Sequence, residues 1–578
     1  MNLLNSLRSR LTYNPTELQF GTSGRRGLVA DLTQLEVYIN VLAELEFLQS
    51  LPPEAGGVAR GDEFYFAYDL RPSSTAFVSQ EYRRGEICQA VVRGLEDAGM
   101  RPVNLGAIPT PALAYYAFSG NKGSIMVTGS HIPFDRNGYK LNTSRGELLK
   151  EHEVPIGQTV RTIREDVYGR AFDESLFDEH GMFKHGHFDL PPGRGDARAE
   201  YLRRYQTFFR GYSLAGKRIL VYQHSAVGRD LLVEVLRDFG ADVIPAGRSD
   251  TFVPIDTENI GDAQLATIQD LADRAASGAG PVDAVVSMDG DSDRPLLVGI
   301  ERGRGTARFF GGDLVGIIAA QFLGADSVVL PISCSDAVDR STLSGVLEPK
   351  TRIGSPYVIA GMRIAREKGR QAICGWEANG GFLTGSDIHR DGQVLQALPT
   401  RDAVLPLLCC LFQSVEKKVG VVELFESLPS RYSKAGLLRP VPGSIGRRVV
   451  ATYSPMDAGI QDVVLGGETI SAFRQDGSEV ALSPEAGQEI RAIRSKLESF
   501  FSPTLGFGSI AHLNYTDGVR ILFGSGDIAH FRPSGNADEL RIYAVADSQD
   551  RADLIVEMAT AGNGILSQMA KIAALSTG

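Results

Sequence analysis

The segment Asp289-Gly-Asp-Ser-Asp-Arg294 places three carboxylates at alternate positions, directly after the apolar run 282–288. The run predicts a buried strand, so the carboxylates would lie on a tight loop at its end. Alternate residues of an extended segment project to the same side, and three converging like charges repel unless a cation neutralises them. Oxygen ligands suit a hard divalent cation. The alternative is an Asp-rich surface turn, but the repeated spacing and the preceding strand favour a metal site at Asp289, Asp291 and Asp293.

A second candidate loop, Thr128-Gly-Ser-His-Ile-Pro133, follows the strand-like segment 123–128. Gly129 would allow a sharp turn that exposes the hydroxyl of Ser130. With His131 and Lys140 close in sequence, this serine could be a nucleophile with acid–base partners. A polar turn closed by a proline is an equal alternative on these residues alone. The absence of a G-x-S-x-G segment argues against an α/β-hydrolase triad.

Two further segments could bind anions. The segment 20–27 combines glycines with Arg25 and its neighbouring arginine, which could wrap an anion, although a basic glycine turn is the simpler interpretation. The segment 531–541 offers several donors that could cradle a phosphate, and a hairpin-like turn with solvated arginines is the alternative. Its candidate binding residues are Arg532, Ser534, Gly535, Asn536 and Arg541.

The Gly-rich segment 374–382 follows a strand-like run and carries Glu377 and Asn379 two positions apart. Both side chains could face a polyol, because carboxylates and amides are good partners for sugar hydroxyls. A glutamate in a Gly-rich loop is also commonly just exposed, so this signal is weak by itself.

The elements that must position these loops alternate along the chain. Segment 218–222 predicts a strand, 231–239 an amphipathic helix, and 243–245 a return to strand, which implies α/β layers. A chain of 578 residues is too long for one core. We interpret the polar segment 143–198 as domain-edge decoration and a linker, and expect further breaks at 301–306 and 428–432. The predicted domains are 1–198, 199–304, 305–430 and 431–578.

Bulk composition narrows the class of protein. A net charge of −11 disfavours nucleic acid as a partner. No signal peptide or membrane span is expected, and five cysteines without a C-x-x-C pair indicate a reducing cytoplasm. Three histidines at 180, 185 and 187 invite a metal interpretation, but a solvated loop is favoured because no matched ligand pair lies nearby.

Taken together, these five loops resemble those of the α-D-phosphohexomutase superfamily, in order and spacing, nearly end to end. The resemblance implies an α/β protein with four domains around a central cleft, each contributing one loop, the last domain being a smaller α+β domain. It further implies that Ser130 carries a phosphoryl group and that Mg²⁺ is held by Asp289, Asp291, Asp293 and the phosphoserine.

The resemblance also implies the remaining roles. Arg25 and Lys140 would assist at the reacting centre, with Lys140 or His131 moving the proton. Arg294, Glu377 and Asn379 would bind the sugar. The segment 531–541 would hold the phosphate that is not reacting, through the five residues given above.

The chain is most similar to a bacterial phosphomannomutase subgroup, which implies interconversion of mannose 6-phosphate and mannose 1-phosphate through a sugar 1,6-bisphosphate. Phosphoglucomutase and phospho(acetyl)glucosamine mutase activities remain alternatives, and a Mg²⁺-dependent sugar phosphatase is a further one. The partner would be a small hexose phosphate, with the protein a monomer or homodimer in the cytoplasm. Departures from the family pattern at Ile132, Pro356, Gly381 and Asn536 concern the sugar contacts and the proton transfer.

Overall fold

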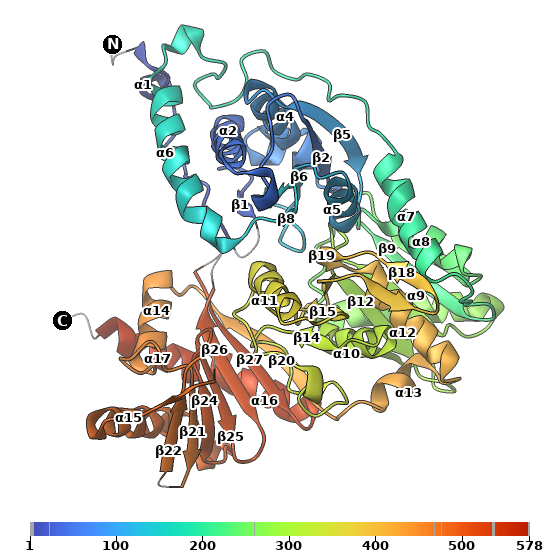
Figure 1. Ribbon diagram of the computed structural model, residues 1–578, viewed down its shortest axis with the longest axis vertical. Helices are drawn as coiled ribbons and strands as arrows, with labels where there is room; N and C mark the ends of the chain where they lie inside the picture. The colour runs from blue at the N-terminus through green and yellow to red at the C-terminus, as the bar shows by residue number, and fades with distance from the viewer. Residues whose placement is uncertain are drawn as a thin grey trace. The chain divides into compact units, whose positions relative to one another are not determined.

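The computed structural model describes residues 5–21, 24–258, 260–467, 469–475, 477–534 and 538–575. The chain forms two compact units. The first comprises Met1–Ser327 with Ser355–Phe425, and the second comprises Val328–Gly354 with Glu426–Gly578. Helices and strands alternate in both (Figure 1), which confirms the predicted α/β class. None of the helices in the described residues combines the length and apolar character that a bilayer span requires.

The first sheet of unit 1 has the strand order β1-β7-β6-β2-β5, with β8 paired to β7. Strands β2, β5 and β6 run parallel, whereas β7 pairs antiparallel with both β6 and β1. The strands are β1 (Arg25–Leu28), β2 (Glu63–Tyr68), β5 (Arg101–Ala107), β6 (Ser124–Val127), β7 (Arg136–Thr143) and β8 (Gly146–Glu147). The predicted strand before Ser130 is therefore present as β6, and all of its residues are buried.

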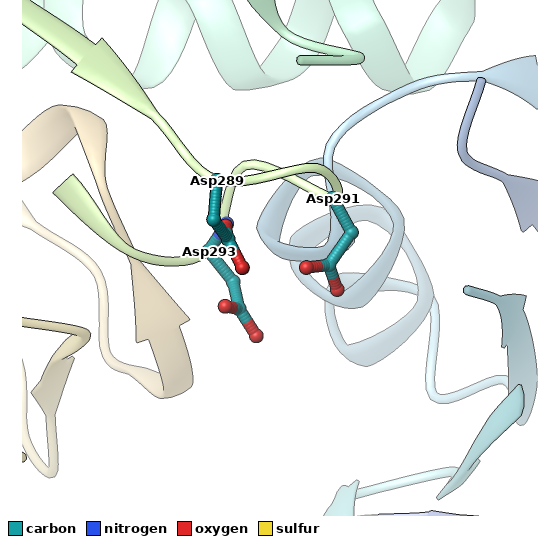
Figure 2. Close-up of side chains that lie close together, drawn as sticks. All are labelled: Asp289, Asp291 and Asp293. Atoms are coloured by element: carbon teal, nitrogen blue, oxygen red, sulfur yellow. The ribbon is translucent and has the colours of Figure 1, made fainter. Parts of the chain in front are cut away.

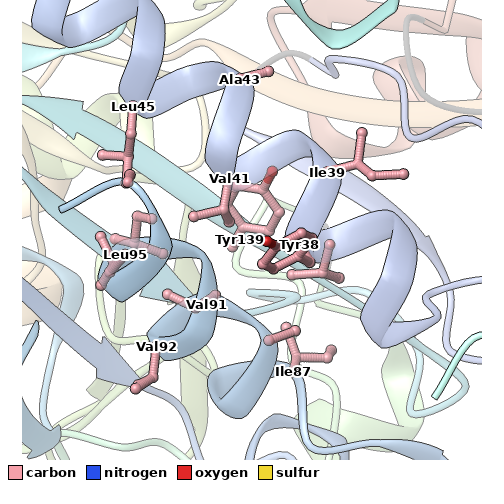
Figure 3. Packing of buried hydrophobic residues seen from close by; sticks show 14 of the residues in the cluster. Tyr38, Ile39, Val41, Ala43, Leu45, Ile87, Val91, Val92, Leu95 and Tyr139 are labelled. Atoms are coloured by element: carbon pink, nitrogen blue, oxygen red, sulfur yellow. The ribbon is translucent and has the colours of Figure 1, made fainter. Parts of the chain in front are cut away.

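Helices α2 (Gln34–Ser50) and α4 (Ile87–Asp97) pack against each other beside this sheet. Figure 3 shows side chains of both helices that belong to the same buried cluster as Tyr139 of β7. Gly94 permits the close approach, because a Cβ there would lie 2.8 Å from a methyl carbon of Val41. This part also contains the helices α1 (Leu7–Arg10), α3 (Pro72–Thr75) and α5 (Thr110–Ser119), and the paired short strands β3 (Phe77–Val78) and β4 (Arg84–Gly85).

The interpretation of residues 143–198 as decoration and a linker is wrong for much of the segment. It contains α6 (Glu153–Gly169), which packs on α2, and α6 contributes Ile156 and Val160 to the same core. The two helices are also joined by an ion pair of 2.6 Å between Arg164 and Glu36. The segment is polar because one side of α6 is exposed to solvent. Its buried apolar residues recur only at helical spacing, and this amphipathic pattern was not recognised from the sequence.

The second sheet has the order β10-β9-β11-β12-β13. Its strands are β9 (Arg218–His224), β10 (Asp242–Arg248), β11 (Ala284–Met288), β12 (Pro295–Ile300) and β13 (Ala307–Phe310). The predicted strand before the acidic loop is β11, which is fully buried. Residues 301–306, expected to be a break, connect β12 to its antiparallel neighbour β13 within this one sheet. The accompanying helices are α7 (Asp196–Phe208), α8 (Arg229–Asp238) and α9 (Asp262–Ala279).

The remainder of unit 1 contains antiparallel pairs of β15 with β16 and of β16 with β19. Its strands are β15 (Ile373–Trp376), β16 (Phe382–Thr384), β17 (Ile388–Arg390), β18 (Gln393–Leu395) and β19 (Leu398–Asp402). The helices are α10 (Gly312–Leu323), α11 (Ser355–Glu367), α12 (Val404–Glu416) and α13 (Val421–Glu426). The short β14 (Ser327–Val329) lies where the chain passes from unit 1 to unit 2.

Unit 2 is built on one eight-stranded sheet with the order β20-β27-β26-β25-β24-β21-β22-β23. Its strands are β20 (Tyr432–Leu438), β21 (Asp462–Gly466), β22 (Thr469–Phe473), β23 (Glu479–Val480), β24 (Ile510–Asn514), β25 (Val519–Phe523), β26 (Ile528–Pro533) and β27 (Leu540–Ala546). Its helices are α14 (Gly443–Thr452), α15 (Pro484–Phe500), α16 (Gln549–Thr560) and α17 (Ile565–Leu575), and they share one apolar core with the sheet. The division of the chain into four domains at the expected boundaries stays a prediction.

Candidate active site

The three loop aspartates converge as their spacing predicts. Asp289, Asp291 and Asp293 each offer a carboxylate oxygen, and these oxygens lie within 4.8 Å of one another. Figure 2 shows the three side chains pointing to the same side of the loop between β11 and β12. All three residues are buried. Oxygen donors in this number and at this separation can hold a hard divalent cation.

The electrostatics of these carboxylates fit a cation. Burial, followed by repulsion from Asp291 and Asp293, raises the pKa of Asp289 well above its ordinary value. Burial alone would also raise the pKa of Asp293, but Arg401, Lys140 and Arg294 hold it far below that value. The Oδ1 atom of Asp291 is buried and accepts no hydrogen bond, so it has ligand capacity left over.

Lys140 of β7 supplies positive charge that compensates two of these carboxylates. Its Nζ lies 2.6 Å from the Oδ2 atoms of both Asp291 and Asp293. Thr110, the first residue of α5, donates its hydroxyl to the same oxygen of Asp291 at 2.6 Å. The structure therefore brings the predicted Lys140 to the acidic loop.

Ser130 also reaches the acidic loop, as predicted. Its Oγ donates to Oδ2 of Asp289 at 2.6 Å, and the side chain is fully buried. The backbone of Ser130 has φ = 56°, a left-handed conformation that costs a non-glycine residue on the order of 1 kcal/mol. Its N–H donates to Oγ1 of Thr128 at 2.7 Å, which secures this conformation. His131, the next residue, is half-buried.

Two residues that the sequence did not single out hold the serine loop in place. The carboxylate of Asp69 accepts the hydroxyl of Thr128 at 2.7 Å. Arg71 donates to the carbonyl oxygens of Ser130, Ile132, Pro133 and Arg136 at 2.5–3.0 Å. Gly129 is required beneath this guanidinium, because a Cβ there would lie 2.6 Å from Nε of Arg71. The charged Asp-Leu-Arg segment directly after β2 was the only sequence feature that could have drawn attention to these two residues. Nothing in it indicates that the arginine would bind four backbone carbonyls.

Arg25 does not reach the acidic loop. Its Nε donates to Glu44 of α2 at 2.6 Å, and its guanidinium stacks on Phe20 at 3.7 Å. Arg25 pairs with Tyr139 in the register of β1 and β7, whereas Arg26 pairs with Gly138. Adjacent residues of a strand face opposite sides, so Arg26 shares the side of Lys140, two residues after Gly138.

Arg26 is the arginine of this pair that interacts electrostatically with the acidic loop. Burial, followed by repulsion from Arg294, lowers its pKa to about 10, while Asp291 and Asp293 oppose the shift. The Nε of Arg26 is buried and makes no hydrogen bond. Arg294 itself lies 3.7 Å from Asp293 and 3.9 Å from Asp289, through its own Nε.

The predicted sugar loop lies beside the same carboxylates. Glu377 and Asn379 are both buried, and Oδ1 of Asn379 accepts the N–H of Gly381 at 3.0 Å. Arg401 of β19, not predicted as a site residue, donates Nη1 to Oε2 of Glu377 at 2.9 Å. Its Nε also donates to Oδ2 of Asp293 at 3.0 Å. The sequence around Arg401 contained no motif that indicates this bridge.

The predicted phosphate segment lies in unit 2, where it forms the end of a hairpin. Arg532 in β26 and Arg541 in β27 are cross-strand partners. The sequence missed β26 and interpreted Arg532 as a loop residue. Nε of Arg532 lies 3.1 Å from Oδ1 of Asp517, and the N–H of Ser534 donates to the carbonyl of Glu539 at 2.9 Å. Gly535 and Asn536 lie outside the described residues.

The histidines at 180, 185 and 187 form no metal cluster with other ligands in the described part of the chain, where the three aspartates are the only such group. His187 instead pairs with Glu86 at 2.6 Å, and this contact raises its pKa. His180 accepts or donates a hydrogen bond with Thr12 at 3.0 Å.

Comparisons with known proteins agree with this geometry. The family model described as "Phosphoglucomutase/phosphomannomutase, alpha/beta/alpha domain I" matches residues 17–166. A phosphomannomutase of Sinorhizobium fredii is 36% identical over 535 residues, covering 93% of this chain and 96% of the relative. A phosphomannomutase of Salmonella muenchen is 34% identical over 551 residues, covering 94% of this chain and 95% of the relative.

Solved structures show the same fold. A phosphoglucomutase/phosphomannomutase family protein of Burkholderia thailandensis superposes with a TM-score of 0.58 at 16% identity, covering 96% of this chain and 97% of that one. The N-acetylphosphoglucosamine mutase of Aspergillus fumigatus, solved with GlcNAc-6P and magnesium, has a TM-score of 0.52 at 15% identity, covering 100% and 99%. On the extent and identity of the sequence matches, this chain belongs to the phosphoglucomutase and phosphomannomutase family.

Proposed function

We propose that this protein interconverts mannose 6-phosphate and mannose 1-phosphate through a phosphoserine enzyme and a sugar 1,6-bisphosphate. The observation that carries the proposal is the 2.6 Å contact between the Ser130 hydroxyl and Asp289 of a buried three-carboxylate cluster. The mannose preference is supported by the names of the two relatives, each more than 90% covered by the match.

In this mechanism the oxygen of Ser130 holds a phosphoryl group and transfers it to the free hydroxyl of the bound hexose phosphate. The P–O bond to Ser130 breaks, a P–O bond to the sugar forms, and the sugar's proton passes to the serine oxygen. Lys140 would move this proton, with His131 as the second candidate. The bisphosphate then turns over, and the other phosphoryl group returns to Ser130 by the reverse steps.

Charge stabilisation must supply most of the catalysis, because phosphate-ester cleavage is very slow without it. Asp289, Asp291, Asp293 and the phosphoserine would hold Mg²⁺, which neutralises the oxygens of the reacting phosphoryl group. We assign to Arg26 the charge-spreading role expected of Arg25, because only Arg26 lies on the side of Lys140.

The substrate contacts are proposed from the same inventory. Glu377 and Asn379 would accept and donate hydrogen bonds to sugar hydroxyls, with Arg294 beside them. The phosphate that is not reacting would be held by residues of unit 2, namely Arg532, Ser534, Gly535, Asn536 and Arg541. Whether the protein is a monomer or a homodimer, and its place in the cytoplasm, stay predictions.

The proposal is tested by measuring turnover of mannose 1-phosphate, glucose 1-phosphate and N-acetylglucosamine 1-phosphate in the presence of Mg²⁺ and the matching 1,6-bisphosphate. We expect the highest kcat/KM with mannose 1-phosphate, and at least a thousandfold loss in Ser130→Ala with an unchanged melting temperature. Greater turnover of glucose or N-acetylglucosamine phosphates would reassign the sugar. Release of inorganic phosphate without isomerisation would instead identify a phosphatase, and full activity of Ser130→Ala would reject the covalent intermediate.

A further inference from the structure

One arginine connects the acidic loop to the sugar loop. The Nε and Nη2 atoms of Arg401 lie 3.0 and 2.8 Å from Oδ2 of Asp293, and its Nη1 lies 2.9 Å from Oε2 of Glu377. The three side chains are only 3%, 1% and 6% exposed. Because one planar group binds both carboxylates, it fixes the distance and the angle between them.

Arg401 is itself held on both sides along β19. The hydroxyl of Thr400 donates to Glu147 of β8 at 2.6 Å. The carboxylate of Asp402 accepts the hydroxyl of Tyr201 from α7 at 2.8 Å. The backbone at Arg401 is therefore anchored to two other elements, and the guanidinium is set in place before any ligand arrives.

The sugar loop is shaped to admit this side chain. A Cβ at Gly381 would lie 2.5 Å from Cδ of Arg401 and 2.7 Å from its Cγ. Any side chain at residue 381 would therefore displace the stem of Arg401. Gly381 and Arg401 form a complementary pair, and the glycine provides the space that the arginine occupies.

We propose that Arg401 is a positioning residue that orients Glu377 relative to the acidic loop and thereby sets the discrimination between hexose epimers. This inference rests on the proposed mutase function. Arg401 and Lys140 together engage Oδ2 of Asp293, and Arg401 engages Oε2 of Glu377. That arrangement leaves Oε1 of Glu377 to accept a sugar hydroxyl at a fixed distance from the reacting centre.

The geometry specifies an arginine, because a charge alone does not reproduce it. Arginine has a rigid fork with donors on two edges, whereas lysine is a single point charge on a flexible stem. A lysine at position 401 would keep the charge but has no planar fork, so it would not fix the angle between Asp293 and Glu377. Epimers differ in the direction of one hydroxyl, so a freely rotating Glu377 would accept either of them.

The test compares Arg401→Lys and Arg401→Met with the wild type, using mannose 1-phosphate and glucose 1-phosphate. We expect both variants to lose at least tenfold in kcat/KM for the preferred sugar, and the ratio between the two sugars to fall at least fivefold. The matched control is Arg164→Lys, because Arg164 is a buried arginine that bridges Glu36 and Glu17 at 2.6 and 3.5 Å outside the site. The control should stay within twofold of the wild type in both quantities.

A second measurement does not depend on turnover. In the Ser130→Ala background, the dissociation constants of the two sugar phosphates are measured by calorimetry with and without Arg401→Lys. Their ratio should fall by the same factor as the kinetic ratio. If Arg401→Met fails to fold, Gly381→Ala tests the same idea, since it displaces the arginine while keeping every charge, and it should reduce the ratio in the same way.

The outcomes separate this inference from the proposed function. An active wild type whose Arg401→Lys variant keeps the wild-type sugar ratio, in turnover and in binding, overturns the positioning role and leaves the mutase proposal standing. A wild type that neither converts nor binds any hexose phosphate overturns both.

Discussion

The assignment of Arg26 instead of Arg25 to the reacting centre can be tested by replacing each with methionine. The two residues are adjacent, yet Arg25 forms a buried ion pair with Glu44, whereas Arg26 interacts electrostatically with the acidic loop. Arg25→Met should therefore affect stability, and Arg26→Met should affect catalysis. A pair of neighbouring variants with opposite effects is a sharper result than either variant by itself.

The size of the stability effect follows from the burial of Glu44. Its side chain has no exposed surface, and burial raises its pKa against the opposing effect of Arg25. Without Arg25 the carboxyl can stay neutral, which at pH 7 costs at most roughly 3.7 kcal/mol against an ordinary pKa of about 4.3, at 1.36 kcal/mol per pH unit. That is within the range of about 3–5 kcal/mol seen when a buried ion pair loses one partner. The melting temperature should fall by at most about 7–15 °C, at the roughly 2–4 °C per kcal/mol that applies to a cooperative unit the size of the predicted domain 1–198.

The pH dependence has a definite sign. In Arg25→Met the folded protein keeps a proton on Glu44 that the unfolded chain releases above a pH of about 4.3, so stability is lost as the pH rises. Lowering the pH from 7 to 5.5 reduces the cost to roughly 1.6 kcal/mol by the same arithmetic. The difference in melting temperature between the variant and the wild type should therefore shrink by more than half. Differential scanning fluorimetry at several pH values measures it directly.

Arg26→Met should behave in the opposite way. Removing its charge relieves repulsion from Arg294 and Arg401 and loses attraction to Asp291 and Asp293, so these effects largely offset and the melting temperature should change by less than about 3 °C. The value of kcat/KM should fall on the order of a hundredfold or more, as for other preorganised charges at a reacting centre. Arg25→Met should keep kcat/KM within about threefold at 25 °C. Normal activity in Arg26→Met, together with lost activity and normal melting in Arg25→Met, would refute the assignment.

Three further outcomes are expected. Gly129→Ala should reduce activity at least tenfold with intact circular dichroism, because its Cβ would displace Arg71 from the carbonyls of the Ser130 loop; wild-type kinetics would show that the loop tolerates the shift. Arg532→Ala should mainly raise KM, since it would bind a spectator phosphate, and an unchanged KM would contradict that role. Mg²⁺ should bind more tightly to the phosphorylated protein than to Ser130→Ala in calorimetry; equal affinities would exclude the phosphoserine as a ligand.

Local sequence patterns were sufficient for the strands that lead into the two central loops. The apolar runs before Ser130 and Asp289 are β6 and β11, because a fully buried strand requires apolar residues on both faces. The same reasoning failed for α6, where alternation of polar and buried positions at helical spacing made the segment 143–198 look solvated. It also failed for β26, because the polar residues His530 and Arg532 interrupt its apolar residues and made the segment resemble a loop.

The site residues also divide into those that a local motif indicates and those that only tertiary contacts reveal. Ser130 and the three aspartates could be found because each follows a strand in a recognisable motif, and Lys140 because it lies close to Ser130 in sequence. Arg401, Asp69 and Arg71 could not, because their importance lies in contacts between segments far apart in the sequence. The choice between Arg25 and Arg26 depended on the register of β1 against β7, and that register is set by tertiary packing.

The charges at the site suggest why a cation and a phosphoryl group would arrive together. Among the described residues, three loop aspartates and Glu377 face four cationic side chains, namely Lys140, Arg26, Arg294 and Arg401. At full ionisation the charges of these eight side chains balance, before the outer carboxylates Glu147 and Asp256 are counted, and uncompensated charge in a buried site is costly. A divalent cation by itself would leave an excess of two positive charges, and a dianionic phosphoryl group on Ser130 by itself would leave two negative ones. Only the pair preserves the balance among these eight side chains, so each should stabilise the other.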